Sequence, residues 1–238
     1  LVIVICQLIL NFNMYYVIIL FLNFIFTDDN GHDLINRKID IECPGNIGCE
    51  CLTSDDCLNE NCLRIPKGGF CMPTEGDKFP DFFSVDQFDN LFSLNDLDTN
   101  GKYVLLEMGT TWCAPCNVLA NWLAWNDNEI ENKKWWKPEY KKIKDLINNN
   151  KVILITVLYE NENRDNANYE TVYEWYENFP DEHTIIISDN NKELHKWYKP
   201  TGIPAFTLLD SNMTVISYTN RGLNTPFDKL LELAHENK

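Results

Sequence analysis

Two cysteines separated by two residues, Cys113 and Cys116, are the side chains of this sequence best placed for chemistry. If a helix begins here, its unpaired N–H groups and its macrodipole favour a thiolate at Cys113. They lower the pKa of that thiol from about 8.5 toward the range of about 3.5 to 7.5. Two intervening residues on a helical turn bring the second sulfur within bonding reach of the first. The spacing predicts a two-electron dithiol couple in which Cys113 attacks a disulfide and Cys116 resolves the product.

The residues next to this pair suit such chemistry. Pro115 lacks a backbone N–H and has φ near helical values, which favours the first turn of a helix and stiffens the loop between the sulfurs. Trp112 precedes the nucleophile and offers a flat apolar contact to a partner, although a core aromatic at a boundary is an equally good interpretation. The pair also has non-catalytic interpretations. It could be an inert structural disulfide, or half of a zinc site that His183 and His195 would complete.

Apolar runs and helical patterns must position the pair. Short apolar runs predict strands at residues 103–108, 152–159, 184–188, 205–209 and 213–218, the last after a turn at 210–212. Helices are expected at residues 116–130, 138–147, 169–178, 192–198 and 225–235. Strands that alternate with helices and then close with a hairpin and a helix predict an α/β fold with a mixed central sheet flanked by helices.

The strand before Trp112, the Cys-Ala-Pro-Cys helix start and the Thr-Gly-Ile-Pro-Ala-Phe segment at residues 201–206 together resemble the thioredoxin superfamily. The resemblance implies that Pro204 is cis and faces the cysteines, and that Ile203 pairs with substrate backbone. An ordinary loop proline is the alternative for Pro204. A Gly-Asp-x-x-Pro-x-Phe approach at residues 76–82 and extra strand–helix material at 159–188 look most like exported thiol–disulfide oxidoreductases of the TlpA/ResA type.

This resemblance covers residues 76–238 and implies protein thiols and disulfides as partners, an upstream electron donor and the reducing direction. It implies no cofactor beyond the Cys113–Cys116 disulfide. The superfamily commonly has a buried acid beneath this site, and Glu107 stands six residues before Cys113. Strand alternation puts Leu105 and Glu107 on one face. A buried Glu107 would have a raised pKa and could accept the Cys116 proton. An exposed carboxylate at the strand end is the alternative.

A second group of cysteines crowds into residues 28–75, a small acidic segment with few large apolar side chains. Its members are Cys43, Cys49, Cys51, Cys57, Cys62 and Cys71. Such a segment cannot build a core, so three disulfides are expected to replace burial, with a pairing that the sequence leaves open. A metal site fails on spacing, because no Cys-x2-Cys pair occurs here and His32 is the only nearby histidine. The module is interpreted as structural or adhesive, and the resemblance does not cover it.

Residues 1–27 carry no charge. Residues 1–26 approach the length of about 20 that spans a bilayer, and so predict a membrane anchor. The run after Met14 alternatively has the length of a signal-peptide core, although a basic region is missing. Export and disulfides agree on an extracytoplasmic location: secreted, periplasmic, or membrane-anchored and facing outward. The predicted organisation is a signal or anchor at 1–27, a cysteine-rich module at 28–75 and a thioredoxin-like domain at 76–238, with the boundary inside residues 72–82.

The net charge of −16 is spread over residues 28–75 and 76–238, and neither segment has a basic stripe that could neutralise phosphates. Nucleic acid is therefore excluded as a partner. The composition holds no serine–histidine–aspartate arrangement or phosphate loop, and its four histidines offer little for metal hydrolysis. Two other functions stay open. A peroxidase is one, since the approach at residues 76–82 is shared with peroxiredoxin-like proteins. A secreted binding protein with a thioredoxin-like scaffold is the other.

Overall fold

The computed structural model describes residues 38–65 and 68–236, which belong to one compact unit, Arg37–Lys238. The segment predicted as a signal peptide or anchor lies outside the described residues. Across the two described ranges, no helix combines the length and the apolar character that crossing a bilayer requires.

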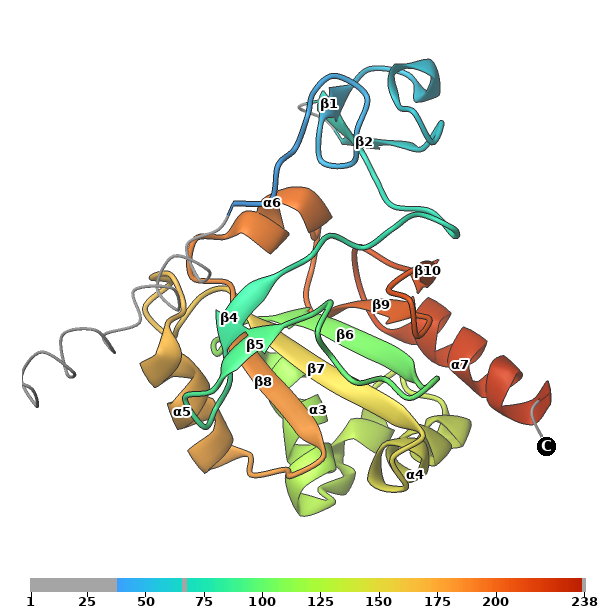
Figure 1. The fold of residues 1–238 in the computed structure, drawn as a ribbon. Helices are drawn as coiled ribbons and strands as arrows, with labels where there is room; N and C mark the ends of the chain where they lie inside the picture. Colours follow the sequence, from blue (N-terminus) through green and yellow to red (C-terminus); the bar gives the residue numbers. More distant parts are fainter. Residues whose placement is uncertain (1–37, 66–67, 237–238) are drawn as a thin grey trace, which may run out of the picture. The chain divides into compact units, whose positions relative to one another are not determined.

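The central sheet has five strands, and α3 (Ala114–Trp125) follows its middle strand (Figure 1). Its strands are β6 (Tyr103–Gly109), β7 (Val152–Leu158), β8 (Thr184–Ser188), β9 (Ala205–Leu209) and β10 (Val215–Tyr218), in the order β10-β9-β6-β7-β8. β6, β7 and β8 are parallel, whereas β9 runs antiparallel to both β6 and β10. This order and these directions are those of a thioredoxin-like fold, so the predicted fold class is confirmed.

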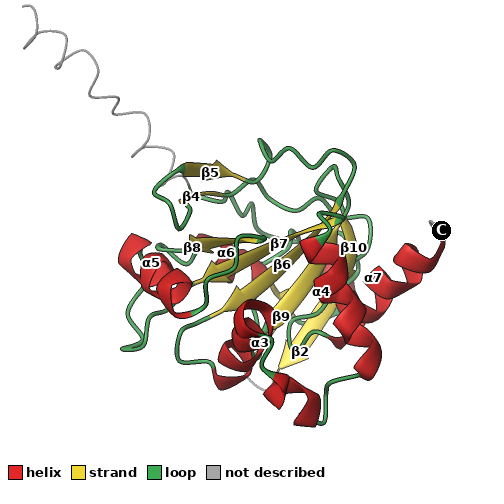
Figure 2. Cartoon of the chain, turned by 90° about the horizontal axis from the view of Figure 1, so that it is seen from below, coloured by secondary structure: helices red, strands yellow, loops and turns green. Residues whose placement is uncertain are grey.

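Helices cover one face of this sheet. α3 (Ala114–Trp125), α4 (Lys141–Asn148) and α7 (Asn224–Glu236) pack on the face that carries Leu105, as Figure 2 shows. α5 (Tyr169–Asn178) packs beside them, next to β8. The short turns η2 (Asn128–Asn132) and η3 (Pro138–Tyr140) connect α3 to α4. Because side chains of a strand alternate, the face that carries Leu105 also carries Glu107.

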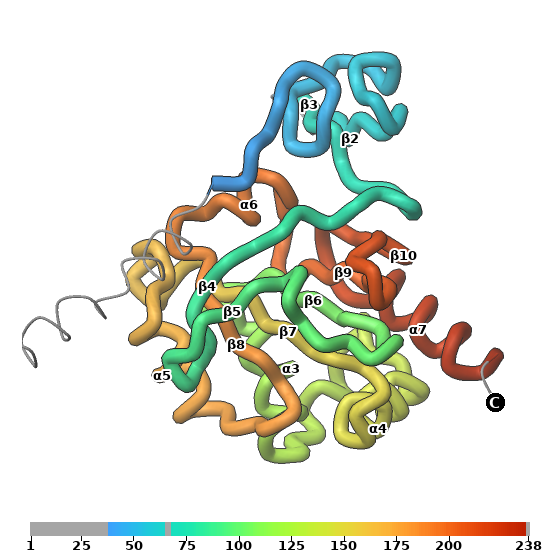
Figure 3. Tube along the Cα trace, in the orientation of Figure 1, coloured from blue at the N-terminus to red at the C-terminus, as the bar shows by residue number. Residues whose placement is uncertain are grey.

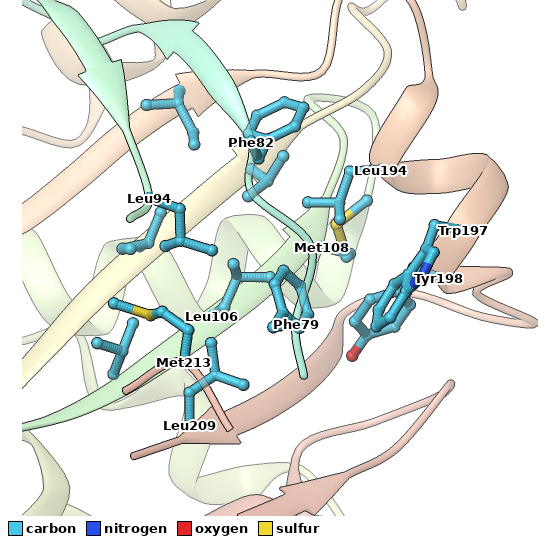
Figure 4. Close-up of a cluster of buried hydrophobic side chains, with 14 of the residues drawn as sticks. Phe79, Phe82, Leu94, Leu106, Met108, Leu194, Trp197, Tyr198, Leu209 and Met213 are labelled. Carbon is cyan, nitrogen blue, oxygen red and sulfur yellow. The ribbon is translucent and has the colours of Figure 1, made fainter. Parts of the chain in front are cut away.

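The opposite face is covered by a hairpin and a short helix. The hairpin pairs β4 (Phe83–Val85) with β5 (Leu91–Ser93), and the helix is α6 (Glu193–Tyr198). Leu106 and Met108 of β6 lie in the apolar cluster between this layer and the sheet (Figure 4). Burying both faces of β6 in this way accounts for its nearly continuous apolar sequence.

Several predicted boundaries differ from those in the structure. The helix expected at residues 138–147 begins as the turn η3, and α4 starts only at Lys141. The helix expected at residues 116–130 begins at Ala114 and ends at Trp125, because Asn126 adopts the left-handed conformation that terminates a helix. The strand expected from residue 213 begins at Val215, since Met213 has positive φ and completes the turn that Asp210 stabilises. The β4–β5 hairpin was not predicted.

The cysteine-rich module contains a small sheet that disulfides cross-link; the crowding of cysteines predicts the disulfides but not the sheet. β1 (Glu50–Cys51), β2 (Cys62–Ile65) and β3 (Gly68–Cys71) pair in the order β1-β3-β2, after the turn η1 (Ser54–Asp56). The disulfides are Cys43–Cys49, Cys51–Cys62 and Cys57–Cys71. Figure 3 follows the chain from β3 through residues 72–82 into β4. The domain boundary in that segment stays a prediction.

Candidate active site at the start of α3

The end of β6 and the start of α3 hold the two cysteines. Cys113 has extended backbone angles and caps the helix, and its Sγ accepts a hydrogen bond from the backbone N–H of Cys116 at 3.2 Å. Pro115 stands in the first turn, where its missing N–H costs no hydrogen bond. The two sulfurs are joined as a disulfide. When the disulfide is reduced, the same donor and the helix dipole favour a thiolate at Cys113.

Both cysteines are buried in the oxidised structure, whereas the residues between them are exposed. Cys113 is 2% exposed and Cys116 is 1% exposed. They pack into an apolar cluster with α5, and Ile203 packs against the same cluster. The exposed surface next to the disulfide thus includes Ala114 and Pro115.

Glu107 lies beneath the helix start and is 3% exposed. Its Oε2 accepts a hydrogen bond from the hydroxyl of Thr156 at 3.0 Å, whereas its Oε1 has no partner among the described residues. Burial raises the pKa of this carboxyl to about 7, against the smaller lowering effect of the Thr156 hydrogen bond. Its ionisation is thereby brought into the range where a group can both take up and release a proton at neutral pH.

Gly109 leaves the space between this carboxyl and the second cysteine open. A Cβ at this position would lie 3.4 Å from Sγ of Cys116 and 3.6 Å from Oε1 of Glu107. The free carboxylate oxygen thus faces the same small space as the Cys116 sulfur.

Trp112 is held by charged residues from two other loops. Its indole N–H donates to Oε2 of Glu160 at 3.0 Å, and Lys192 donates to the other oxygen at 2.7 Å. The Arg164 guanidinium lies 4.1 Å from the centre of the indole ring. Burial raises the pKa of Glu160, but the hydrogen bonds from Lys192 and Trp112 outweigh it and leave this pKa below its ordinary value. These contacts fix the orientation of Trp112 beside Cys113.

Sequence reasoning missed Glu160, Lys192 and Arg164. A usable signal existed for Glu160, because it follows the end of β7, and the carboxyl ends of neighbouring parallel strands meet at the edge where such a site forms. Lys192 and Arg164 lie in loops, and nothing in their local sequence indicates their approach to Trp112.

The Ile203–Pro204 peptide is cis, and Pro204 lines one groove together with Pro115 of the CXXC segment. The Pro204 carbonyl accepts the Gly222 N–H at 2.7 Å. By contrast, the backbone N–H and C=O of Ile203 form no hydrogen bond with the described part of the chain. The structure therefore brings Ile203 and Pro204 beside the cysteines, and their binding roles stay predictions.

The histidines named for a zinc site are elsewhere. His195 lies on α6 with its ring against Tyr159, and burial lowers its pKa to about 4. His183 precedes β8 beside Glu182. Within residues 38–65 and 68–236, the only close group of metal-type ligands is Cys51, Cys57 and Cys62, whose sulfurs are all in disulfides.

No protein-family model matches the sequence, and no curated protein matches it. Among solved structures, a thioredoxin-like protein from Bacteroides caccae is 18% identical with a TM-score of 0.48, over 69% of this chain and 50% of that one. A putative thiol:disulfide interchange protein DsbE from Chlorobium tepidum is 18% identical with a TM-score of 0.47, over 68% and 96%. An exposed lipoprotein thioredoxin from Streptococcus pneumoniae is 18% identical with a TM-score of 0.45, over 66% and 98%.

The match thus spans half the length of the first of these proteins. Thioredoxin-like and thiol:disulfide interchange proteins are among the structural neighbours of this chain, at low sequence identity.

Proposed function

We propose that this chain is a thiol–disulfide oxidoreductase that exchanges electrons with protein disulfides, in the reducing direction. The observation that carries the proposal is the arrangement at the start of α3. The Cys113 sulfur caps the helix and accepts a backbone N–H, while the buried Glu107 carboxyl faces the space next to the Cys116 sulfur. Each sulfur thus has the group that its step requires.

The reaction takes two exchanges. The Cys113 thiolate attacks one sulfur of the substrate disulfide, which forms a mixed disulfide and releases the other substrate sulfur as a thiolate. Cys116 then loses its proton to the Glu107 carboxylate and attacks Sγ of Cys113. The substrate leaves as a dithiol after gaining two electrons, and the Cys113–Cys116 disulfide forms. An upstream dithiol must return these electrons before the next cycle.

The surroundings supply the remaining roles. The free backbone groups of Ile203 can pair with an extended substrate segment, with Pro204 beneath it and Trp112 as a flat wall. The three disulfides of the cysteine-rich module favour an oxidising, extracytoplasmic location. Membrane anchoring through residues 1–26 is part of this proposal and concerns residues outside those described.

Reductase assays of variants with single cysteine changes test this function. Cys113→Ser should abolish turnover of a protein disulfide such as that of insulin. Cys116→Ser should instead accumulate a mixed disulfide with substrate, visible by mass spectrometry. The matched control is Cys43→Ser with Cys49→Ser, which removes a disulfide of the module and should leave turnover in place. Unchanged turnover in Cys113→Ser would reject the assignment, and direct consumption of peroxide by the reduced chain would favour a peroxidase instead.

A further inference from the structure

A groove of about 370 Å³ runs beside the CXXC segment. Apolar side chains make most of its walls: Pro115, Trp135, Ile203, Pro204 and Leu223. The Trp135 wall is held in place by Asn224 at the start of α7, which donates to the Trp135 carbonyl at 2.7 Å and to the Tyr140 hydroxyl at 2.8 Å. The groove is therefore formed before any partner arrives.

Among the residues that the structure describes, Arg221 is the only charged one that lines this groove. It is exposed, and no carboxylate forms an ion pair with it within the described ranges. Its side chain lies across Gly202, where a Cβ would come within 2.9 Å of its Cγ and Cδ. The glycine thus lets Arg221 lie against the loop that contains Ile203 and Pro204.

The chain has a net charge of −16, but none of its described acidic residues lines this groove. An unpaired guanidinium beside a carboxylate-free apolar groove is complementary to an acidic side chain on an otherwise apolar segment. Arg221 lies beside the Ile203–Pro204 loop. An acidic side chain of the partner that reaches Arg221 would therefore belong to the same polypeptide segment as the disulfide under attack.

We propose that this groove binds an extended segment of a disulfide-bonded protein, and that Arg221 selects partners with an acidic residue close to the reactive cysteine. This inference rests on the proposed function and names its substrate class. Arg221 recognises the substrate. It therefore controls the ratio of the rates at which the reduced chain reacts with two different disulfides.

The test compares two cystine-bridged peptides that differ only in having Glu or Gln beside one cysteine. The pre-reduced full chain is mixed with each peptide, and the second-order rate constant of its oxidation to the Cys113–Cys116 disulfide is measured. We expect the Glu peptide to react about threefold faster, the scale of one ion pair at an exposed site. Added salt should reduce this ratio, because the charge is screened by solvent ions.

Variants then assign the preference. Arg221→Gln should reduce the ratio to about one, Arg221→Lys should keep part of it, and Arg221→Glu should invert it. Arg64→Gln is the matched control, since Arg64 is an exposed arginine of β2 that does not line the groove, and it should keep the full ratio. Equal rates for both peptides with the unmodified chain, or a ratio that survives in Arg221→Gln, would overturn the inference. If neither peptide oxidises the unmodified chain, the proposed function itself fails.

Discussion

The free carboxylate oxygen of Glu107 and the sulfur of Cys116 border the same open position, the one that a side chain at Gly109 would fill. Oε1 of Glu107 has no hydrogen-bond partner among the described residues, and both side chains are buried. A buried acid without a partner on one oxygen is unfavourable for folding. Under the proposed function, its position next to the Cys116 sulfur accounts for this cost.

Replacing Glu107 with Gln should slow the step in which Cys116 attacks the mixed disulfide by about 10²-fold, the low end for loss of a general base. In the unmodified chain this step should accelerate as pH rises through about 7, because only the ionised carboxylate accepts a proton. The variant should lose that acceleration. Rapid-quench trapping of the mixed disulfide over a pH series measures both. A pH profile that is the same in both proteins would exclude Glu107 as the proton acceptor.

The same substitution should make the protein more stable at alkaline pH. Burial raises the pKa of Glu107 from 4.5 to about 7, so the folded state holds a proton that the unfolded state releases between these values. This contribution to stability is complete below pH 4.5 and is lost as pH rises through about 7, a loss of about 3 kcal/mol.

Urea unfolding of the oxidised protein at pH 5 and pH 8 measures this effect. Asp189 is also buried, and burial raises its pKa to about 6, so the unmodified chain has a second pH-dependent contribution. The difference between the unmodified chain and Glu107→Gln isolates Glu107, because both proteins contain Asp189. A free energy of unfolding that falls equally in both between these pH values would contradict the prediction.

Gly109→Ala should separate the carboxyl from the sulfur without unfolding the protein. Gly109 does not have positive φ, and the added methyl group would make ordinary contacts of 3.4 and 3.6 Å with Cys116 and Glu107. Under the proposed function it would fill the space through which the Cys116 proton passes to Glu107, so we expect the attack of Cys116 to slow by about tenfold. The attack of Cys113 on substrate, measured in the same experiment, is the internal control. Equal slowing of both steps would point to a general distortion instead.

Gln87 should contribute strongly to stability through its contacts with β8, although it lies far from that strand in sequence. Its buried amide donates to the Thr184 carbonyl and accepts from the Ile186 N–H, each at 2.9 Å, and so satisfies the outer edge of β8. Gln87→Leu leaves both backbone groups buried without partners and should cost about 3 kcal/mol in the free energy of unfolding. Asn90→Ala removes only exposed hydrogen bonds to Asp86 and should change stability by less than about 0.5 kcal/mol. Denaturant titration compares the two.

Much of the sheet was predictable because it depends on local pattern. The apolar runs at residues 103–108, 184–188 and 205–209 lie within β6, β8 and β9. The hairpin β4–β5 was not predicted because its strands have only three residues each. A side-chain hydrogen bond joins it to β8, and no local sequence pattern indicates such a contact. The pairing of the six cysteines in the module could not be predicted either, because local sequence patterns do not indicate which cysteines meet in the folded chain.

Local chemistry in the sequence determined that Cys113 lies at the N-terminal end of a helix, that Pro115 fits the first turn of this helix, and that Glu107 shares a face with Leu105. All three follow from neighbours along one strand or one helical turn. Tertiary structure alone decided that Glu160 holds Trp112 and that Arg221 lies across Gly202. These contacts join residues that are far apart in the chain. They exist only because the sheet brings the ends of its strands and the loops after them to one edge.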